Sequence, residues 1–328
     1  MANFLILLAG LLLALHLYRE YWARRSLPRV VNADFDGRLY RVGETVIAVR
    51  EAAKNSDESI LCFPGFLEDM RYFQHLYSGS DAQLILINNA NYHSPFPDDA
   101  VEALDWPDNP YAVGTIEHDG FYLALALQHL SSGSRISLHG HSRGGAVVLE
   151  AGRQSPELTR PADRSISAVL EAPVLPGARA AGRSSNPLPH ALISYLIPVV
   201  LGLLRNSSRD RLLQQPMMRP TNSLKTELCQ SLYSVAKNYR TCVANVRSIH
   251  RWQRQTSDDV YTNYARIVVV AGERDDVLDN ASLLASAERG RALNRGVQIL
   301  RTEKTNHFIS LERPEYLRQL YRPGQEPG

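Results

Sequence analysis

A serine lies between two glycines in Gly140-His141-Ser142-Arg143-Gly144, where an apolar run ends and a helix-like segment begins. Glycine is unfavourable inside regular structure, so its presence two positions before and after a serine indicates a sharp turn. At the carboxyl end of a strand such a turn exposes the hydroxyl, and the following helix directs backbone N–H groups toward it. The pattern predicts a nucleophile at Ser142. In the alternative interpretation this serine only caps the helix.

A serine hydroxyl is a weak nucleophile unless a base accepts its proton and a third group orients that base. Two later segments contain suitable residues. Asp275 and Asp276 follow the apolar run 265–272, and His307 follows the run 296–303. An imidazole titrates near neutral pH and can therefore carry the proton. We expect Asp275 to orient His307. The alternatives are Asp276 as the acid, or carboxylates that only face solvent.

The elements that must position these residues are short apolar runs that alternate with longer amphipathic segments. Runs without polar alternation are typical of strands buried on both faces. Their alternation with helices predicts an α/β fold with a mostly parallel sheet flanked by helices. The expected strands are a hairpin at 38–51 and the runs 59–65, 82–89, 135–140, 165–173, 265–272 and 296–303; the expected helices are 68–78, 118–130, 144–154, 281–293 and 314–321.

Residues 174–264 interrupt this alternation with helical patterns and no convincing strand. We expect them to form a helical cap, or lid, on a core built from residues 26–173 and 265–328. Within the cap, residues 190–205 are strongly apolar but are interrupted by a proline and a glycine. This segment is too short and too broken for a membrane span. It is either a kinked helix packed on the core, or a lid helix that lines an acyl pocket or touches a bilayer.

The amino-terminal residues 1–25 differ in kind from the rest of the chain. Residues 3–18 carry no charge and are rich in leucine, and the tyrosine and tryptophan side chains after them suit a membrane interface. A secretory signal carries its positive charge before the apolar run, whereas Arg19, Arg24 and Arg25 follow it here. The charges predict an uncleaved single-pass membrane anchor with the following domain in the cytoplasm. A signal peptide or an amphipathic surface helix is the alternative.

The composition argues against several classes of partner. The formal net charge is only +2 and no basic run is interleaved with aromatic residues, so we expect no nucleic-acid partner. Cys62, Cys229 and Cys242 have no metal-ligand spacing and suit a reducing compartment; a Cys229–Cys242 disulfide is the alternative in an oxidising one. The acidic neighbours of His118 point away from one another on a helix, so we expect no metal and no cofactor. The oligomeric state cannot be inferred from the sequence.

The chain order of Ser142, Asp275 and His307, together with the order of the elements, resembles the α/β-hydrolase superfamily over roughly residues 38–322. The segments GHSRGG, GERDDVLD and NHFISLERPEYL look like the nucleophile elbow, the acid loop and the histidine loop of that family. The family also places a helical cap between its sixth and seventh strands, and residues 174–264 occupy that position.

The resemblance also implies an oxyanion hole. In that family the N–H of the residue after the nucleophile, here Arg143, is one donor, and the loop after the third strand supplies the other. The corresponding loop here has Pro64-Gly65 in place of the common His-Gly. Phe66 resembles the second donor, and Leu67 is the alternative.

These residues predict a serine hydrolase that cleaves a carboxylic ester through an acyl-enzyme on Ser142. The anchor and the apolar cap suggest a lipophilic substrate, a small-molecule acyl or lipid ester at a membrane. A thioesterase or a membrane acyltransferase would use the same residues with another leaving group or acceptor. A non-catalytic binding protein on the same fold is a further alternative.

Overall fold

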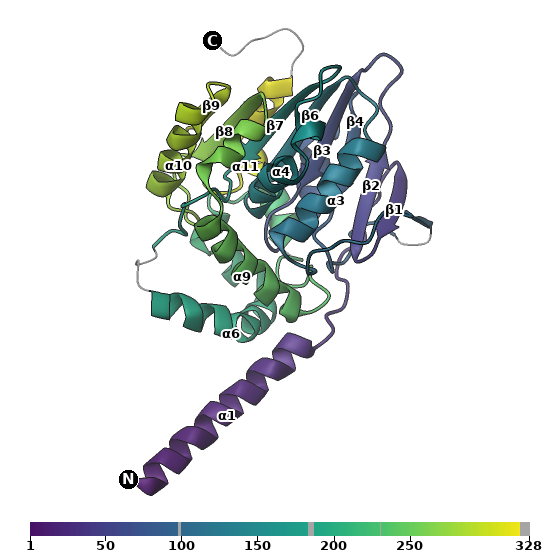
Figure 1. Cartoon of the computed structure of the whole chain (residues 1–328). Coiled ribbons are helices and arrows are strands. Elements are labelled where there is room, and N and C mark those ends of the chain that lie inside the picture. Colours follow the sequence, from purple (N-terminus) through teal and green to yellow (C-terminus); the bar gives the residue numbers. More distant parts are fainter. Residues whose placement is uncertain (98–99, 183–186, 230, 322–328) are drawn as a thin grey trace.

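A nine-stranded sheet forms the centre of the molecule (Figure 1). The computed structural model describes residues 1–97, 100–182, 187–229 and 231–321. The strands are β1 (Arg38–Val42), β2 (Thr45–Arg50), β3 (Glu58–Phe63), β4 (Gln83–Ile87), β5 (Val101–Ala103), β6 (Arg135–His141), β7 (Ser165–Glu171), β8 (Arg266–Gly272) and β9 (Val297–Thr302).

The strand order is β5-β1-β2-β4-β3-β6-β7-β8-β9. The β1–β2 hairpin and the β2–β4 pair are antiparallel, and every neighbouring pair from β4 to β9 is parallel. The predicted mostly parallel sheet is therefore confirmed. Because the carboxyl ends of β6, β8 and β9 lie at the same edge, residues that directly follow these strands are brought close together.

Helices cover both faces of the sheet. The helices are α1 (Ala2–Arg24), α2 (Arg71–Leu76), α3 (Ile116–His129), α4 (Arg143–Gln154), α5 (Pro156–Thr159), α6 (Pro187–Arg205), α7 (Arg209–Leu213), α8 (Ser223–Cys229), α9 (Tyr239–Gln255), α10 (Asn280–Leu293), α11 (Ile309–Glu312) and α12 (Pro314–Arg318). The helices α3, α4 and α10 pack against one face, and α2, α11 and α12 against the other.

Alternate strand residues face the two cores. On β2, Ile47 and Val49 belong to the core under α3 and α4, whereas Val46 and Ala48 belong to the core under α2 and the cap. All four side chains are at most 3% exposed. This burial on both faces explains why the strands read as continuous apolar runs, and each large buried side chain contributes about 1.5–3 kcal/mol.

The segment between β7 and β8 contains α6, α7, α8 and α9, and its described residues contain no element of the sheet. In Figure 1 these helices lie at the end of the body from which α1 leaves. We propose that residues 174–264, which contain these helices, form the expected cap. Residues 183–186 and 230 of this segment, and 322–328 of the expected core, lie outside the described residues.

The amino-terminal helix α1 projects away from the body (Figure 1). Its 23 residues are long and apolar enough to cross a membrane, and no part of its most apolar window is buried. Its last turns contact the body, where Trp22 and Ala23 are buried.

The structure contains short elements that were not expected, among them β5, α5 and α11, and one expected helix begins later. The short strand β5, which pairs with β1, was missed because three residues give no periodic signal. The helix expected over 68–78 begins only at Arg71, because the preceding residues form a turn in which Leu67 has a φ of 64°. All three cysteines are free and buried, so the alternative Cys229–Cys242 disulfide is absent.

Candidate active site

Ser142 occupies the sharp turn between β6 and α4, with a backbone φ of 51°. This left-handed conformation is uncommon for a residue with a side chain and is typical of a nucleophile turn. The Ser142 N–H donates to the carbonyl of Glu171 at 2.8 Å, and the Ser142 carbonyl accepts from the N–H of Val174 at 2.9 Å. The end of β7 therefore holds the strained turn in place.

The glycines that flank the serine are required by space. A Cβ atom on Gly140 would lie 2.2 Å from the carbonyl oxygen of Gly144, and a Cβ atom on Gly144 would lie 1.9 Å from that of Phe63. Neither backbone oxygen can move away without disrupting a strand or a helix. The close approach of β3, β6 and α4 at this turn explains the spacing of the two glycines.

His307 and Asp275 face each other across the loops after β9 and β8. His307 Nδ1 lies 2.9 Å and 3.1 Å from the two Asp275 carboxylate oxygens. Asp275 Oδ1 also accepts the backbone N–H groups of Val277 and Leu278, both at 2.8 Å. Burial alone would raise the pKa of Asp275, but His307 and these two N–H groups lower it overall. The carboxylate is therefore held ionised and aimed at one imidazole nitrogen.

Asp276, the alternative acid, has a different partner. Its Oδ2 atom accepts from Asn306 Nδ2 at 2.7 Å, and its backbone N–H donates to Asn306 Oδ1 at 2.9 Å. The same amide oxygen also accepts the N–H of His307 at 2.8 Å. Asp276 thus joins the two loops to each other, while Asp275 meets the imidazole.

The histidine loop touches the serine turn directly. The Nε2 atom of His141, adjacent to Ser142, lies 3.0 Å from the carbonyl oxygen of His307. Further along the same loop, the N–H and hydroxyl of Ser310 donate to the Glu171 carboxylate at 2.6 Å and 2.5 Å. Ser142 and His307 are 7% and 3% exposed, so both side chains lie beneath the surface.

Glu171 is a buried anchor for this loop. Its carboxylate also accepts from Tyr72 OH at 2.6 Å and lies 3.1 Å from His139 Nε2. Burial alone would raise the pKa of Glu171, but His139, His141 and Ser310 lower it to about 2. Sequence reasoning did not identify Glu171.

The loop after β3 contains the candidate oxyanion donors. The N–H of Leu67 faces Tyr92 OH at 3.4 Å, and Tyr92 in turn donates to Asn245 of α9 at 2.9 Å. Among the described residues, the N–H of Phe66 has no hydrogen-bond partner. The geometry therefore favours Phe66 over Leu67 as the loop donor, and it links this loop to the cap.

Arg143 contributes a backbone N–H at the first position of α4, while its side chain points into the core. Its guanidinium lies 2.7 Å from Asp119 Oδ2 and donates to Asn89 Oδ1 at 2.7 Å. Both members of this ion pair are fully buried. His118 Nδ1 lies 3.0 Å from the other Asp119 oxygen. The charged cluster fixes the start of α4, so Arg143 is not available to bind a ligand through its charge.

Glu68 is a second buried acid near the site that sequence reasoning missed. It is 7% exposed, and its Oε2 atom accepts the Gly65 N–H at 2.7 Å. The same oxygen lies 2.7 Å from His141 Nδ1. Burial alone would lower the pKa of His141, but Glu68 raises it to about 9. The two side chains form a buried ion pair between the β3 loop and the end of β6.

Glu68, His141 and His307 have the composition of a metal site, with one donor atom from each lying within 4.8 Å of the others. However, both His141 nitrogens are already paired, one with Glu68 and the other with the His307 carbonyl. The Nδ1 atom of His307 is hydrogen-bonded to the Asp275 carboxylate. Hydrogen bonds therefore account for both His141 nitrogens and for His307 Nδ1 without an ion.

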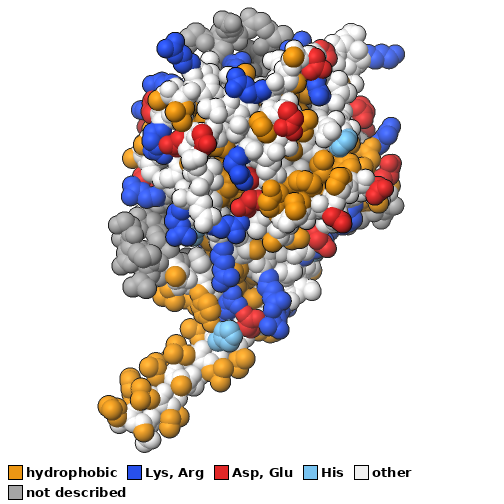
Figure 2. Space-filling model, in the orientation of Figure 1, with side chains coloured by type: hydrophobic (Ala, Val, Ile, Leu, Met, Phe, Trp, Pro, Cys, Tyr) orange, Lys and Arg blue, Asp and Glu red, His pale blue; other side chains and the backbone are white. Residues whose placement is uncertain are grey.

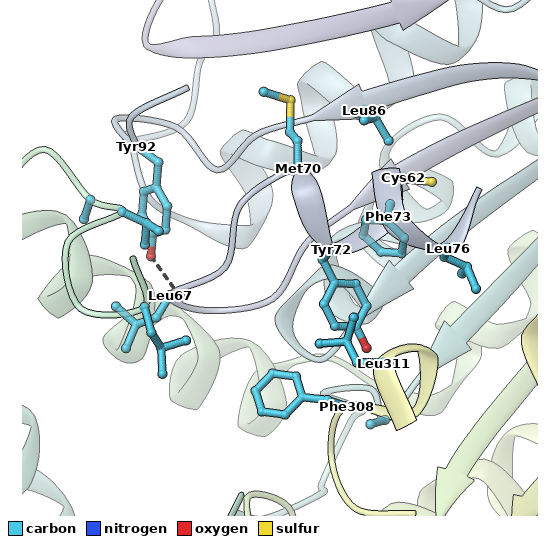
Figure 3. Packing of buried hydrophobic residues seen from close by; sticks show 14 of the residues in the cluster. Cys62, Leu67, Met70, Tyr72, Phe73, Leu76, Leu86, Tyr92, Phe308 and Leu311 are labelled. Carbon is cyan, nitrogen blue, oxygen red and sulfur yellow. Dashed lines mark hydrogen bonds between the residues drawn. The ribbon is translucent and has the colours of Figure 1, made fainter. Parts of the chain in front are cut away.

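A small apolar cavity lies between the β3 loop and the cap. Its volume is about 20 Å³, which is room for roughly one water molecule. Leu67, Tyr72, Phe308 and Leu311, which line it, are drawn in Figure 3. Glu68 also lines this cavity, so it adjoins the site.

Comparisons with known proteins agree with this geometry. A model of the alpha/beta hydrolase family matches residues 60–320. Among solved structures, MenH from S. aureus is 14% identical, with a TM-score of 0.57 and coverage of 84% of this chain and 95% of that one. A thermophilic esterase from Thermogutta terrifontis is 16% identical, with a TM-score of 0.57 and coverage of 84% and 91%.

The N-acyl homoserine lactone degrading enzyme Est816 is 18% identical, with a TM-score of 0.57 and coverage of 88% of this chain and 100% of that one. At these identities the structural likeness shows the fold. No match was found among curated proteins. Because the family model spans most of the chain, including the serine turn and the acid and histidine loops, the chain belongs to the alpha/beta hydrolase family.

Proposed function

We propose that this hydrolase cleaves a carboxylic ester through an acyl-enzyme formed on Ser142. The observation that carries the proposal is the buried, hydrogen-bonded Asp275–His307 pair, whose loop contacts His141, the neighbour of the serine in the strained turn. An imidazole oriented by an ionised carboxylate is the arrangement that activates a serine hydroxyl.

The reaction follows from these positions. His307, with Nδ1 held by Asp275, accepts the Ser142 hydroxyl proton at Nε2 as the serine oxygen attacks the ester carbonyl carbon. The N–H groups of Phe66 and Arg143 stabilise the resulting oxyanion. When the intermediate collapses, the ester C–O bond breaks and His307 donates its proton to the departing alcohol. A water molecule then repeats the sequence on the acyl-enzyme and releases the acid.

The substrate is proposed to be lipophilic. The cavity next to the site is lined mainly by apolar side chains from the β3 loop, the cap and the histidine loop. The helix α1 is apolar along its exposed length, which supports anchoring of the chain to a membrane. The arginines at its carboxyl-terminal end favour a cytoplasmic catalytic domain. An acyl or lipid ester in that membrane would suit both features.

A fluorophosphonate probe tests the nucleophile. The purified full-length chain should be labelled stoichiometrically, and Ser142→Ala should not be labelled. The partly exposed Ser207→Ala variant is the matched control and should behave like the parent chain. Labelling that persists in Ser142→Ala would contradict the proposal.

A panel of p-nitrophenyl esters of increasing acyl length, with matched thioesters, tests the substrate class. We expect kcat/KM for the esters to rise with chain length and to exceed that for the thioesters. A preference for acetate would contradict the lipophilic substrate, and a preference for thioesters would favour a thioesterase.

A further inference from the structure

The cap helix α6 is apolar on both of its faces. Ile197 and Leu201 are buried against the body at 9% and 6% exposure. On the other side, Leu192, Val200 and Leu203 are 58%, 46% and 57% exposed. At about 100° per residue, these three positions fall within roughly 80° of one another on the helix surface.

A helix that faces water usually carries polar side chains on its outer face. Between residues 191 and 204 the sequence of α6 has no charged residue, and its polar side chains are Ser194 and Tyr195. Ser194 is buried, and Tyr195 OH lies 2.7 Å from His16 of α1. The exposed face formed by Leu192, Val200 and Leu203 is therefore unlike a surface in contact with water.

Helix α1 packs on α6 at positions that border this outer face. The Arg19 guanidinium donates to the Tyr195 carbonyl at 3.2 Å. A Cβ atom on Gly202 would lie 2.4 Å from the indole of Trp22, so the two helices pack closely at that point. Figure 2 shows apolar side chains along α1, with basic ones gathered where it meets the body.

The length of α1 determines the depth at which these contacts would lie in a membrane. A bilayer core is crossed by about 20 helical residues. If the apolar start of this 23-residue helix spans that core, the α6 contacts at residues 19 and 22 lie near the membrane–water interface, and the contact at residue 16 lies just inside the core. Arg24 and Arg240, whose side chains are 65% and 58% exposed, lie in the same region and suit lipid phosphates.

We propose that the outer face of α6, formed by Leu192, Val200 and Leu203, inserts into the interface of the bilayer that α1 crosses. The proposal rests on the membrane anchoring of α1 proposed above and is independent of the reaction. Burying these three side chains in the acyl–headgroup boundary removes from water a surface that the described residues leave exposed. The cap would then contact the bilayer directly.

Site-specific fluorescence tests the proposal on the full-length chain. An environment-sensitive nitrobenzoxadiazole dye is attached to Leu203→Cys, and to Val200→Cys as an independent second position. The matched control is Leu293→Cys on α10, which is also 57% exposed but lies on the body away from α1 (Figure 1). Leu11→Cys reports on α1 itself. The parent chain, whose three cysteines are buried, gives the labelling background.

Each protein is reconstituted in phosphatidylcholine vesicles with or without brominated acyl chains, which quench the dye on contact. We expect blue-shifted emission and at least about twofold quenching at 203 and 200, and no quenching at 293. Quenching at position 11 with none at 203 and 200 would overturn the proposal for α6 and leave the anchor intact. If position 11 is not quenched either, both the anchor and the α6 contact are wrong. None of these outcomes depends on esterase activity, which is measured separately.

Discussion

The imidazole of His141 and the carboxylate of Glu68 form a buried ion pair, with Nδ1 and Oε2 separated by 2.7 Å. The pair joins two segments that the proposed reaction must hold together. Glu68 binds the Gly65 N–H next to Phe66, and His141 donates to the carbonyl of His307. A carboxylate beside an oxyanion hole opposes the developing negative charge unless a cation compensates it. We infer that protonated His141 supplies this compensation.

Replacing His141 by Gln should therefore be more harmful than replacing both partners. The single variant leaves the Glu68 carboxylate buried without its counter-ion. We expect His141→Gln to lower kcat on a soluble ester by at least about tenfold, and His141→Gln/Glu68→Gln to recover most of the loss, because paired groups couple by about 0.5–3 kcal/mol. Steady-state kinetics measures both values.

The exposed Lys237–Glu44 ion pair, at 2.9 Å, is the control for this comparison. Exposed pairs contribute little, so the Gln variants of these two residues should have additive and small effects. Charge compensation by His141 would be refuted if the double variant His141→Gln/Glu68→Gln were no more active than His141→Gln.

The same pair should make the free energy of unfolding fall as the pH rises. The pKa of His141 is about 9 in the folded chain and near 6.5 in an unfolded chain. Between these values the folded state binds more protons, so this contribution is complete below about pH 6.5 and is lost as pH rises through 9. In urea unfolding at pH 6.5 and pH 9.5, the parent chain should lose more stability than Glu68→Gln, whose His141 lacks its partner. Equal losses would show that the pair does not control the titration.

The candidate site residues that directly follow a strand could be predicted from the sequence. Ion-pair partners that lie far apart in the sequence could not. Ser142, Asp275 and His307 each carry a local signal, because a glycine turn or an apolar run directly precedes them. Glu68 carries no such signal, since its partner His141 is 73 residues away and only the parallel register of β3 and β6 brings them together. The Asp119–Arg143 pair was missed for the same reason.

Asp275 and Asp276 are adjacent in sequence but should differ sharply in function. Asp275 holds His307 Nδ1, whereas Asp276 binds Asn306. We expect Asp275→Asn to lower kcat/KM by about 10³–10⁴, because loss of the acid leaves the imidazole in the wrong tautomer. Asp276→Asn keeps a side chain that can bond to an amide and should remain within about tenfold of the parent chain. Kinetics on one activated ester compares the two, and near-parent activity of Asp275→Asn would exclude it as the orienting acid.

The space around Gly144 makes the strongest prediction about folding. A Cβ atom there would lie 1.9 Å from the Phe63 carbonyl oxygen, which is fixed at the end of a central strand. The clash must move β3 or α4, so Gly144→Ala should lower the free energy of unfolding by more than about 2 kcal/mol. Gly79→Ala is the matched control, because a Cβ atom on Gly79 would meet no atom within 4 Å. That control should stay within about 0.5 kcal/mol of the parent chain. Urea unfolding monitored by circular dichroism measures both, and a Gly144→Ala variant as stable as Gly79→Ala would show that the turn between β6 and α4 is looser than its contacts indicate.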